Sequence, residues 1–161
     1  MVLLLLRHGD VAEFSDSDST RKLSERGEFQ ARVAGKALVT MGIPIDAIIS
    51  SPLTRAQQTA GIIQTILGVS SCTLSEYLVP ESNPGQIVAA LNSMSCKSPL
   101  LVGHEPILKT LTSLLVTGST QSKIAYTRAS LGCISVPHPM AYGTGALQWL
   151  LTNEQMELFA R

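Results

Sequence analysis

The chain has 161 residues, of which 45% are hydrophobic and 15% charged, and its 12 basic residues balance 12 acidic ones to a formal net charge of zero. This length suits one domain around a single core, and the composition excludes a disordered chain. The zero net charge argues against a nucleic-acid partner, and no apolar run approaches the roughly 20 residues of a membrane-spanning helix. We therefore expect one cytoplasmic domain over residues 1–161, a monomer with no nucleic-acid or membrane partner.

The chain begins with an unbroken apolar run from Val2 to Leu6, followed directly by Arg7, His8 and Gly9. Because polar residues do not alternate in this run, it predicts a strand buried on both faces inside a parallel sheet. Open α/β sheets bind ligands at the edge where such a strand ends. Gly9 is expected to allow a sharp turn there and the close approach of a ligand.

A polar segment over residues 10–22 follows, and it contains Asp18 and Arg21. We expect a surface loop that leaves the carboxyl edge of the sheet, returns to it and can serve as a lid. Ser24 is then the predicted N-cap of a helix that ends near Gly42.

A second apolar strand, residues 45–49, leads into Ser51 and Pro52, which suit the cap and first turn of a helix that runs to Gly68. Arg55 would lie in the first turn of this helix. Free backbone N–H groups and the positive end of the helix dipole also lie there, so this is an anion-binding position.

The rest of the chain continues the alternation and then changes character. The predicted elements are a short extended segment at 72–79, a helix at 84–94, a buried strand at 98–102, a helix that ends at Gly118, and a hairpin-like pair of strands at 131–136 and 146–151. The strand at 98–102 runs directly into Gly103 and His104. The pattern assigns no element to the tail.

The three cysteines, Cys72, Cys96 and Cys133, are widely spaced and form no Cys-x-x-Cys pair. A zinc site or a redox pair is therefore not indicated. We expect small buried side chains in a reducing cytosol.

The predicted strands end in a set of cationic and imidazole side chains: Arg7, His8, Arg55 and His104. The ends of parallel strands share one edge of a sheet, and clustered cations at a helix N-terminus are what a dianionic phosphoryl group needs. A histidine among cations resists protonation, so its lone pair can attack phosphorus. Taken singly, each of these residues is more often an ordinary surface or helix-start group. A metal site of the two histidines is a further alternative, which the arginines oppose by repelling a divalent cation.

Four motifs occur in order: Arg7-His8-Gly9, Leu23-Ser24-x-x-Gly27 with Gln30-Ala31, Ser50-Ser51-Pro52-Leu53-x-Arg55-Ala56-x-x-Thr59, and Gly103-His104-Glu105-Pro106. Together they resemble the histidine phosphatase (phosphoglycerate mutase-like) superfamily. The short chain and its Arg7-His8-Gly9-Asp10 start are most similar to the SixA-type phosphohistidine phosphatases. The resemblance extends from residue 2 to about residue 115. It implies a three-layer α/β/α sandwich with a mostly parallel central sheet.

The resemblance also implies roles for individual residues. His8 would be the nucleophile that forms a covalent phosphohistidine, and three further residues would complete the phosphate pocket: Arg7, Arg55 and His104. Five residues are expected to contact substrate: Gly9, Asp18, Arg21, Ser51 and Glu76. Of these, Asp18 and Arg21 match polar lid positions of SixA-like members. No metal ion or organic cofactor is implied.

The chain departs from the larger members of the superfamily around Glu76, which stands near their acid position but lacks the longer insertion that surrounds it. A phosphohistidine needs little or no proton from the enzyme, because imidazole is a good leaving group. The departure therefore favours a phosphohistidine phosphatase whose partner is a phosphohistidine-bearing phosphotransfer protein in signalling. Two alternatives stay open. The first is another enzyme, a phosphatase for a small phosphorylated substrate or, with less support, a mutase. The second is a module that binds phosphorylated proteins without catalysis.

Overall fold

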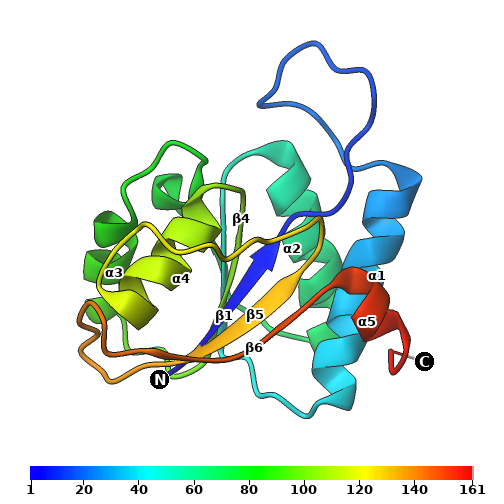
Figure 1. Cartoon of the computed structure of the whole chain (residues 1–161). Coiled ribbons are helices and arrows are strands. Elements are labelled where there is room, and N and C mark those ends of the chain that lie inside the picture. The colour runs from blue at the N-terminus through cyan, green and yellow to red at the C-terminus, as the bar shows by residue number, and fades with distance from the viewer. Residues whose placement is uncertain (161) are drawn as a thin grey trace.

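The computed structural model describes residues 1–160. A central sheet carries helices on both faces, and a loop projects away from the sheet after the first strand (Figure 1). In chain order the elements are β1 (Val2–Arg7), α1 (Glu25–Thr40), β2 (Ala47–Ser50), α2 (Thr54–Leu67), β3 (Cys72–Leu74), the 3₁₀ turn η1 (Glu76–Leu78), α3 (Pro84–Asn92), β4 (Pro99–Gly103), α4 (Ile107–Thr117), β5 (Leu131–Ser135), β6 (Ala146–Leu151) and α5 (Asn153–Glu157). Among residues 1–160, none of the helices combines the length and the apolar character that a membrane crossing requires.

Within these residues the sheet has six strands in the order β3-β2-β4-β1-β5-β6. The strands from β3 to β1 are parallel, whereas β5 is antiparallel to β1 and β6 to β5, which confirms the mostly parallel sheet. Arg7 at the end of β1 pairs with Gly103 at the end of β4. Because β5 is antiparallel, its first residue, Leu131, pairs with Leu6. The segment before β5 therefore lies at the same edge as the ends of β1 and β4.

Alternate side chains of β1 enter two separate cores, because successive residues of a strand point to opposite faces. Leu3 and Leu5 pack with side chains of α3 and α4. Leu4 and Leu6 pack on the other face with α1 and α2 and with the C-terminal segment that holds α5. All four leucines are fully buried. The predicted strand buried on both faces and the three-layer sandwich are both confirmed.

Helix α2 begins later than the sequence predicts. Its N-cap is Leu53, which makes no side-chain capping hydrogen bond, so the prediction that Ser51 caps this helix is wrong. The Ser51 hydroxyl instead accepts the Leu53 backbone N–H at 3.3 Å and lies 2.8 Å from Nε2 of His104. Arg55 is the second residue of α2, which confirms its place in the first turn.

Gly9 serves a contact within the fold that the sequence analysis did not foresee. A Cβ on Gly9 would lie 2.5 Å from the carbonyl oxygen of Gly27, and a Cβ on Gly27 would lie 2.0 Å from the carbonyl oxygen of Asp10. Both distances are far below van der Waals contact, so the two glycines allow the chain after β1 to touch the start of α1. Gly9 therefore has a packing role within the fold, and its contact with a ligand stays a prediction.

The tail forms the short helix α5. Thr152 and Gln155 exchange hydrogen bonds in a capping box at its start. Asn153 then donates through Nδ2 to the carbonyl oxygen of Gln30 at 3.0 Å, which attaches α5 to α1. The Thr-x-x-Gln pattern at residues 152–155 is the sequence signal for this capping box.

The cysteines are not uniformly buried as predicted. Cys133 is buried in β5 and Cys96 is half-buried, but Cys72 is exposed. Cys72 opens β3, which is an edge strand of the sheet, and all three residues of β3 are exposed.

Candidate active site

A small polar pocket of about 150 Å³ lies at the edge where β1 and β4 end. Its lining comes from six places: the end of β1, the loop after it, the start of α2, the segment after η1, the segment between β4 and α4, and the segment before β5. The lining residues are Arg7, His8, Val11, Asp18, Arg21, Arg55, Pro80, His104, Glu105 and Arg128. The structure therefore brings together Arg7, His8, Arg55 and His104, as the strand ends predicted.

His8 is almost fully buried, with 2% of its surface exposed. Its Nδ1 lies 2.8 Å from the carbonyl oxygen of Gly9. A carbonyl can only accept, so Nδ1 carries the proton and Nε2 carries the lone pair. Burial is the main cause that lowers the pKa of His8 to about 2, and His104 and the arginines add to it. The ring is thus neutral at pH 7, and the nitrogen that bears its lone pair is Nε2.

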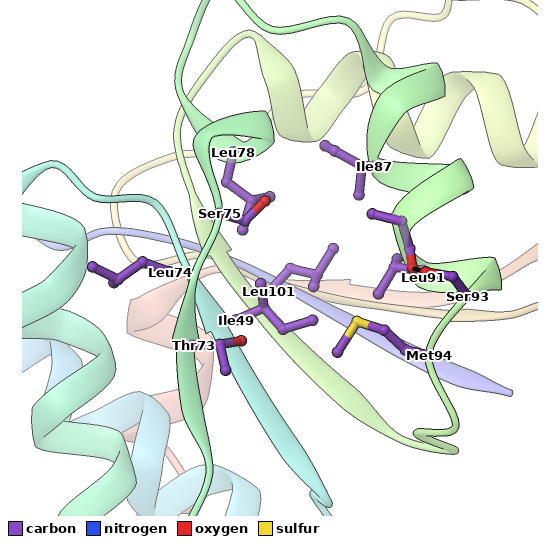
Figure 2. Close-up of a pocket in the computed structure, with 11 residues that line it drawn as sticks. Ile49, Thr73, Leu74, Ser75, Leu78, Ile87, Leu91, Ser93, Met94 and Leu101 are labelled. Carbon is purple, nitrogen blue, oxygen red and sulfur yellow. Dashed lines mark hydrogen bonds between the residues drawn. The ribbon is translucent and has the colours of Figure 1, made fainter.

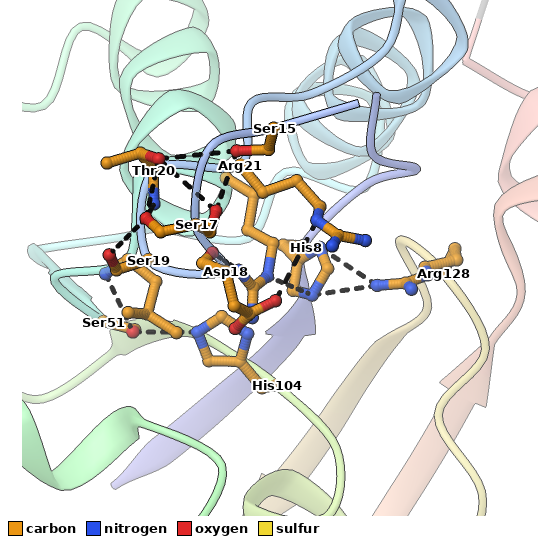
Figure 3. A network of polar contacts seen from close by, with 12 residues as sticks. His8, Ser15, Ser17, Asp18, Ser19, Thr20, Arg21, Ser51, His104 and Arg128 are labelled. Atoms are coloured by element: carbon orange, nitrogen blue, oxygen red, sulfur yellow. Dashed lines mark hydrogen bonds and ion pairs between the residues drawn. The ribbon is translucent and has the colours of Figure 1, made fainter. Parts of the chain in front are cut away.

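Arg55 connects His8 to the loop after β1. Its Nε donates to Nε2 of His8 at 3.3 Å. Its Nη1 donates to the carbonyl oxygen of Asp18 at 2.6 Å, and its Nη2 contacts Oδ2 of the same residue at 3.0 Å. Figure 3 shows the Asp18 side chain directed toward the two histidine rings. The carboxylate of Asp18 therefore occupies part of the cationic pocket in the structure.

His104 packs beside His8, with ring centroids 4.8 Å apart. Its Nε2 lies 2.8 Å from the Ser51 hydroxyl (Figure 3). Burial, followed by the charge of Arg55, lowers the pKa of His104 to about 3, so this ring is also neutral at pH 7. A neutral ring has one N–H; if Ser51 donates to Nε2, that proton lies on Nδ1, which can then donate to an anion.

Arg7 is held by a backbone carbonyl group of the segment before β5. Its Nη1 donates to the carbonyl oxygen of Tyr126 at 2.6 Å. Several polar atoms of the pocket lining are buried yet have no hydrogen-bond partner among the described residues: Arg7 Nε, Arg21 Nε, His104 Nδ1 and Glu105 Oε1. Buried polar atoms are nearly always paired in folded proteins. Three of these four belong to cationic or donor groups, which indicates that the pocket is built to receive an anion.

Arg128 is a site residue that the sequence analysis missed. It lies three residues before β5, and its Nη1 is 2.9 Å from Nε2 of His8 (Figure 3). Its Nε faces Oδ1 of Asp10 at 3.8 Å. The available signal was an arginine shortly before a predicted strand. That signal could be used only with the knowledge that β5 runs antiparallel beside β1.

Glu76 lies outside the pocket, contrary to its expected contact with substrate. It is exposed at the start of η1, and its carbonyl oxygen accepts a hydrogen bond from Ser82. Leu78, two residues later, is 1% exposed and anchors this turn to the core. A different carboxyl, that of Glu105, lines the pocket. Burial raises the pKa of Glu105, while the charge of Arg7 lowers it.

A second cavity, of about 240 Å³, lies between the sheet and α3 (Figure 2). Its lining is mainly apolar, with Ile49, Leu101 and Met94 among the residues drawn. No titratable side chain lines it within the described chain. This cavity therefore offers no side chain for acid–base chemistry.

The two buried histidines make the protein less stable in acid. Their pKa values are about 2 and about 3 in the folded state and near 6.5 when unfolded, so the unfolded state takes up protons that the folded state refuses. As far as these two histidines are concerned, the free energy of unfolding is therefore highest above pH 6.5 and decreases as the pH falls toward 3. Between pH 7.5 and 5.5 we expect each histidine to cost about 1.4 kcal/mol of unfolding free energy. Urea unfolding at the two pH values measures this loss.

Two variants check that assignment. His104→Gln should remove about half of the loss due to the two histidines, whereas His138→Gln, which removes an exposed histidine, should leave the loss unchanged. An identical pH dependence of stability in wild type and His104→Gln would contradict it.

The comparisons with known proteins agree with this geometry. The model of the histidine phosphatase superfamily (branch 1) matches residues 3–78, which include Arg7, His8 and Arg55. The mitochondrial serine/threonine-protein phosphatase Pgam5 of Drosophila persimilis is 46% identical over 61 residues. These residues are 38% of this chain and 21% of Pgam5, so the match spans about a fifth of that relative.

Solved structures match over nearly the whole chain. The protein histidine phosphatase SixA, in complex with tungstate, is similar with a TM-score of 0.87 and 25% identity, over 95% of this chain and 97% of SixA. The alpha-ribazole phosphatase from Shigella flexneri has a TM-score of 0.78 and 16% identity, over 95% of this chain and 97% of that chain, which shows a shared fold. The expected resemblance and the expected fold are confirmed.

Proposed function

We propose that this chain, whose residues 3–78 match the model of the histidine phosphatase superfamily, is a member of that superfamily and a phosphatase that removes phosphoryl groups from phosphohistidine through a covalent intermediate on His8. The observation that carries the proposal is the state of Nε2 of His8. This nitrogen bears a lone pair, and guanidinium groups lie 3.3 Å and 2.9 Å from it. A nucleophile surrounded by fixed cations is suited to attack a phosphoryl group and to hold it after the transfer.

The reaction would proceed in two displacements. In the first, the Nε2 lone pair of His8 forms a bond to phosphorus while the bond from phosphorus to the substrate nitrogen breaks. The substrate imidazole leaves with that electron pair, and it is neutral when its other ring nitrogen carries a proton. In the second, a water oxygen bonds to phosphorus, the electron pair of the P–N bond returns to Nε2, and the water releases its proton to solvent. The arginines and His104 would stabilise the phosphoryl oxygens in both steps.

A phosphohistidine substrate is favoured by the position of Glu76. This carboxyl, which stands near the acid position of larger superfamily members, is exposed and does not line the pocket. An ester oxygen leaves slowly without a proton donor, whereas imidazole does not need one. General acid catalysis is worth roughly 10²- to 10⁴-fold, so its absence would separate the two substrate classes by a similar factor.

A protein-borne phosphoryl group is favoured by the size of the pocket. Its 150 Å³ is well below the ~300–1,000 Å³ that encloses a drug-sized ligand. The pocket can therefore take a phosphoryl group and a few neighbouring atoms, while the rest of the substrate stays outside. The SixA structure, that of a protein histidine phosphatase, has the same fold over 95% of this chain. We propose a phosphohistidine-bearing phosphotransfer protein as the partner.

A second function is favoured by Glu105. Its Oε1 is buried without a partner, it lines the pocket, and burial raises its pKa toward the protonated form that a general acid requires. If this carboxyl reaches the leaving group, the protein would be a phosphomonoesterase. Its substrates would be small phosphate esters or phosphorylated serine and threonine side chains, and the Pgam5 similarity is consistent with the latter.

A comparison of substrates, together with one variant, separates the two functions. The wild type is assayed on a phosphotransfer domain carrying radiolabelled phosphohistidine, on a phosphoserine peptide and on a sugar phosphate. We expect kcat/KM for the phosphohistidine protein to be at least about 100-fold above that for either ester. Glu105→Gln should leave the phosphohistidine reaction nearly unchanged.

Comparable turnover of esters and phosphohistidine, with a loss confined to esters in Glu105→Gln, would favour the phosphomonoesterase. Tight binding of the phosphoprotein without release of phosphate would instead indicate a binding module. The control is Glu81→Gln, which changes an exposed glutamate outside the pocket and should alter neither reaction.

A further inference from the structure

Arg128 touches the reacting atom of the candidate site from an element outside the four sequence motifs. Its Nη1 lies 2.9 Å from Nε2 of His8 and 3.3 Å from Nδ1. The shorter distance is to the nitrogen that bears the lone pair, so Arg128 donates its N–H to the nucleophile in the resting site. It also lines the polar pocket.

The backbone around Arg128 is fixed against β1. The backbone N–H of Ala129 donates to the carbonyl oxygen of His8 at 3.2 Å, and the backbone N–H of Arg7 donates to the carbonyl oxygen of Ser130 at 3.1 Å. Ala129 has a φ of +53°, a left-handed conformation that residues with a side chain seldom adopt. Such strain persists where surrounding contacts impose it. Nucleophile and arginine are therefore held together by backbone hydrogen bonds as well as by their side chains.

The ion pair with Asp10 does not explain this placement. The Arg128 Nε to Asp10 Oδ1 distance is 3.8 Å, and about a third of each side chain is exposed. The other carboxylate oxygen of Asp10 is already bound by Arg26 at 3.1 Å and by Gln30 at 3.4 Å. Exposed pairs of this kind contribute little to stability. The Asp10 contact orients the guanidinium, while the closer contact is with the nucleophile.

We infer that Arg128 is a catalytic residue of this site. When substrate binds, its Nη1–H stops donating a hydrogen bond to Nε2 of His8 and donates one to a phosphoryl oxygen instead. This inference rests on the proposed function and extends it. Phosphorus must approach along the Nε2 lone pair, the direction that Arg128 N–H occupies at rest. Once that lone pair is engaged, the nearest acceptors for Nη1 are the oxygens bonded to phosphorus. Arg128 thus stabilises the charge on those oxygens as the P–N bond to His8 forms and breaks.

Three variants test this role. Arg128→Ala is expected to lower kcat/KM by about 10²- to 10³-fold, the usual cost of one lost donor to a developing oxyanion. It should also slow labelling of His8 and weaken inhibition by inorganic phosphate. Arg128→Lys keeps a point charge and should recover part of the loss, and added guanidinium chloride should rescue Arg128→Ala. Lys123→Ala removes an exposed cation from the same segment and should behave as wild type.

A merely structural arginine would give a different result. Arg128→Ala with wild-type kinetic constants and phosphate inhibition, or a loss that guanidinium does not rescue and that accompanies a lower melting temperature, would overturn the inference. Calorimetry of inorganic phosphate binding to the wild type and to Arg128→Ala tests the inference about Arg128 separately from the proposed function. If the wild type turned over no phosphoryl donor, the proposed function would fail, and Arg128→Ala must still bind phosphate more weakly for Arg128 to be a phosphoryl ligand.

Discussion

His8→Ala is expected to lose turnover by on the order of 10⁴-fold or more while the protein stays folded, because the covalent route cannot begin without the Nε2 lone pair. His8 is buried, but it faces a polar pocket, so water can replace the ring as the acceptor for the Arg55 and Arg128 donors. The variant should therefore keep the wild-type circular dichroism spectrum.

Rapid quench of the labelled reaction checks the chemistry directly. Wild type should carry an acid-labile, base-stable phosphoenzyme, and His8→Ala should carry none. His138→Ala is the matched control, since it removes an exposed histidine from the loop between β5 and β6. Label that persists on His8→Ala would reject His8 as the nucleophile, and label lost from both variants would point to a general effect of the preparation.

The predictable part of the site is the part that local sequence determines. The apolar run Val2–Leu6 has the length and pattern of a strand buried on both faces, and whatever follows such a strand must lie at the edge of the sheet. Arg55 follows a short apolar strand in the same way, and so does His104. Parallel strands all end at one edge, so three local patterns were enough to bring the four residues together without knowledge of the strand order.

Arg128 could not be predicted by that reasoning. It precedes an antiparallel strand, and only the pairing of β5 with β1 places the start of β5 at the active edge. Pairing between distant strands depends on the packing of the whole sheet, and the pattern of residues 131–136 contains no information about it. The same residues would fit a strand at the far edge, where Arg128 would be an ordinary surface cation.

Glu76 was misplaced for a related reason. The position of a carboxyl in a 3₁₀ turn depends on which of its neighbours is anchored in the core. Leu78 is 1% exposed and packs with β4 and α4, and this leaves Glu76 on the solvent side. A short turn has no periodicity from which the buried residue can be identified. Glu105, which adjoins the predicted His104, lines the pocket instead, although the sequence pattern gave it no role.

Arg55→Ala is expected to lower kcat by about 10²- to 10³-fold, because it removes a donor that lies 3.3 Å from the nucleophile. Its side chain is 8% exposed, and its guanidinium contacts His8 and both the backbone and the carboxylate of Asp18. Arg55→Lys keeps the charge but cannot reproduce the planar fork that makes these contacts together, so it should recover at most about tenfold. Steady-state kinetics on the phosphohistidine protein measures both variants.

Asp18→Ala separates the two functions that Arg55 can have. Asp18→Ala removes the carboxylate contact at 3.0 Å but keeps the hydrogen bond from Arg55 Nη1 to the Asp18 carbonyl oxygen. If Arg55 acts mainly by pinning the loop, this variant should therefore reproduce part of the loss in kcat. If Arg55 acts on the phosphoryl group, Asp18→Ala frees its guanidinium from a competing carboxylate. The KM for the substrate and the inhibition constant of inorganic phosphate should then fall, with less than about tenfold change in kcat.

Arg32→Ala provides the matched control for loss of an ion-paired helical arginine. Arg32 pairs with Glu28 at 3.1 Å on the exposed face of α1, one turn apart, and its side chain is 53% exposed. Its removal should leave kinetics unchanged and alter stability by less than about 0.5 kcal/mol. A loss of kcat of more than about tenfold in Asp18→Ala as well would assign Arg55 to loop positioning, whereas a loss confined to Arg55→Ala assigns it to the phosphoryl group.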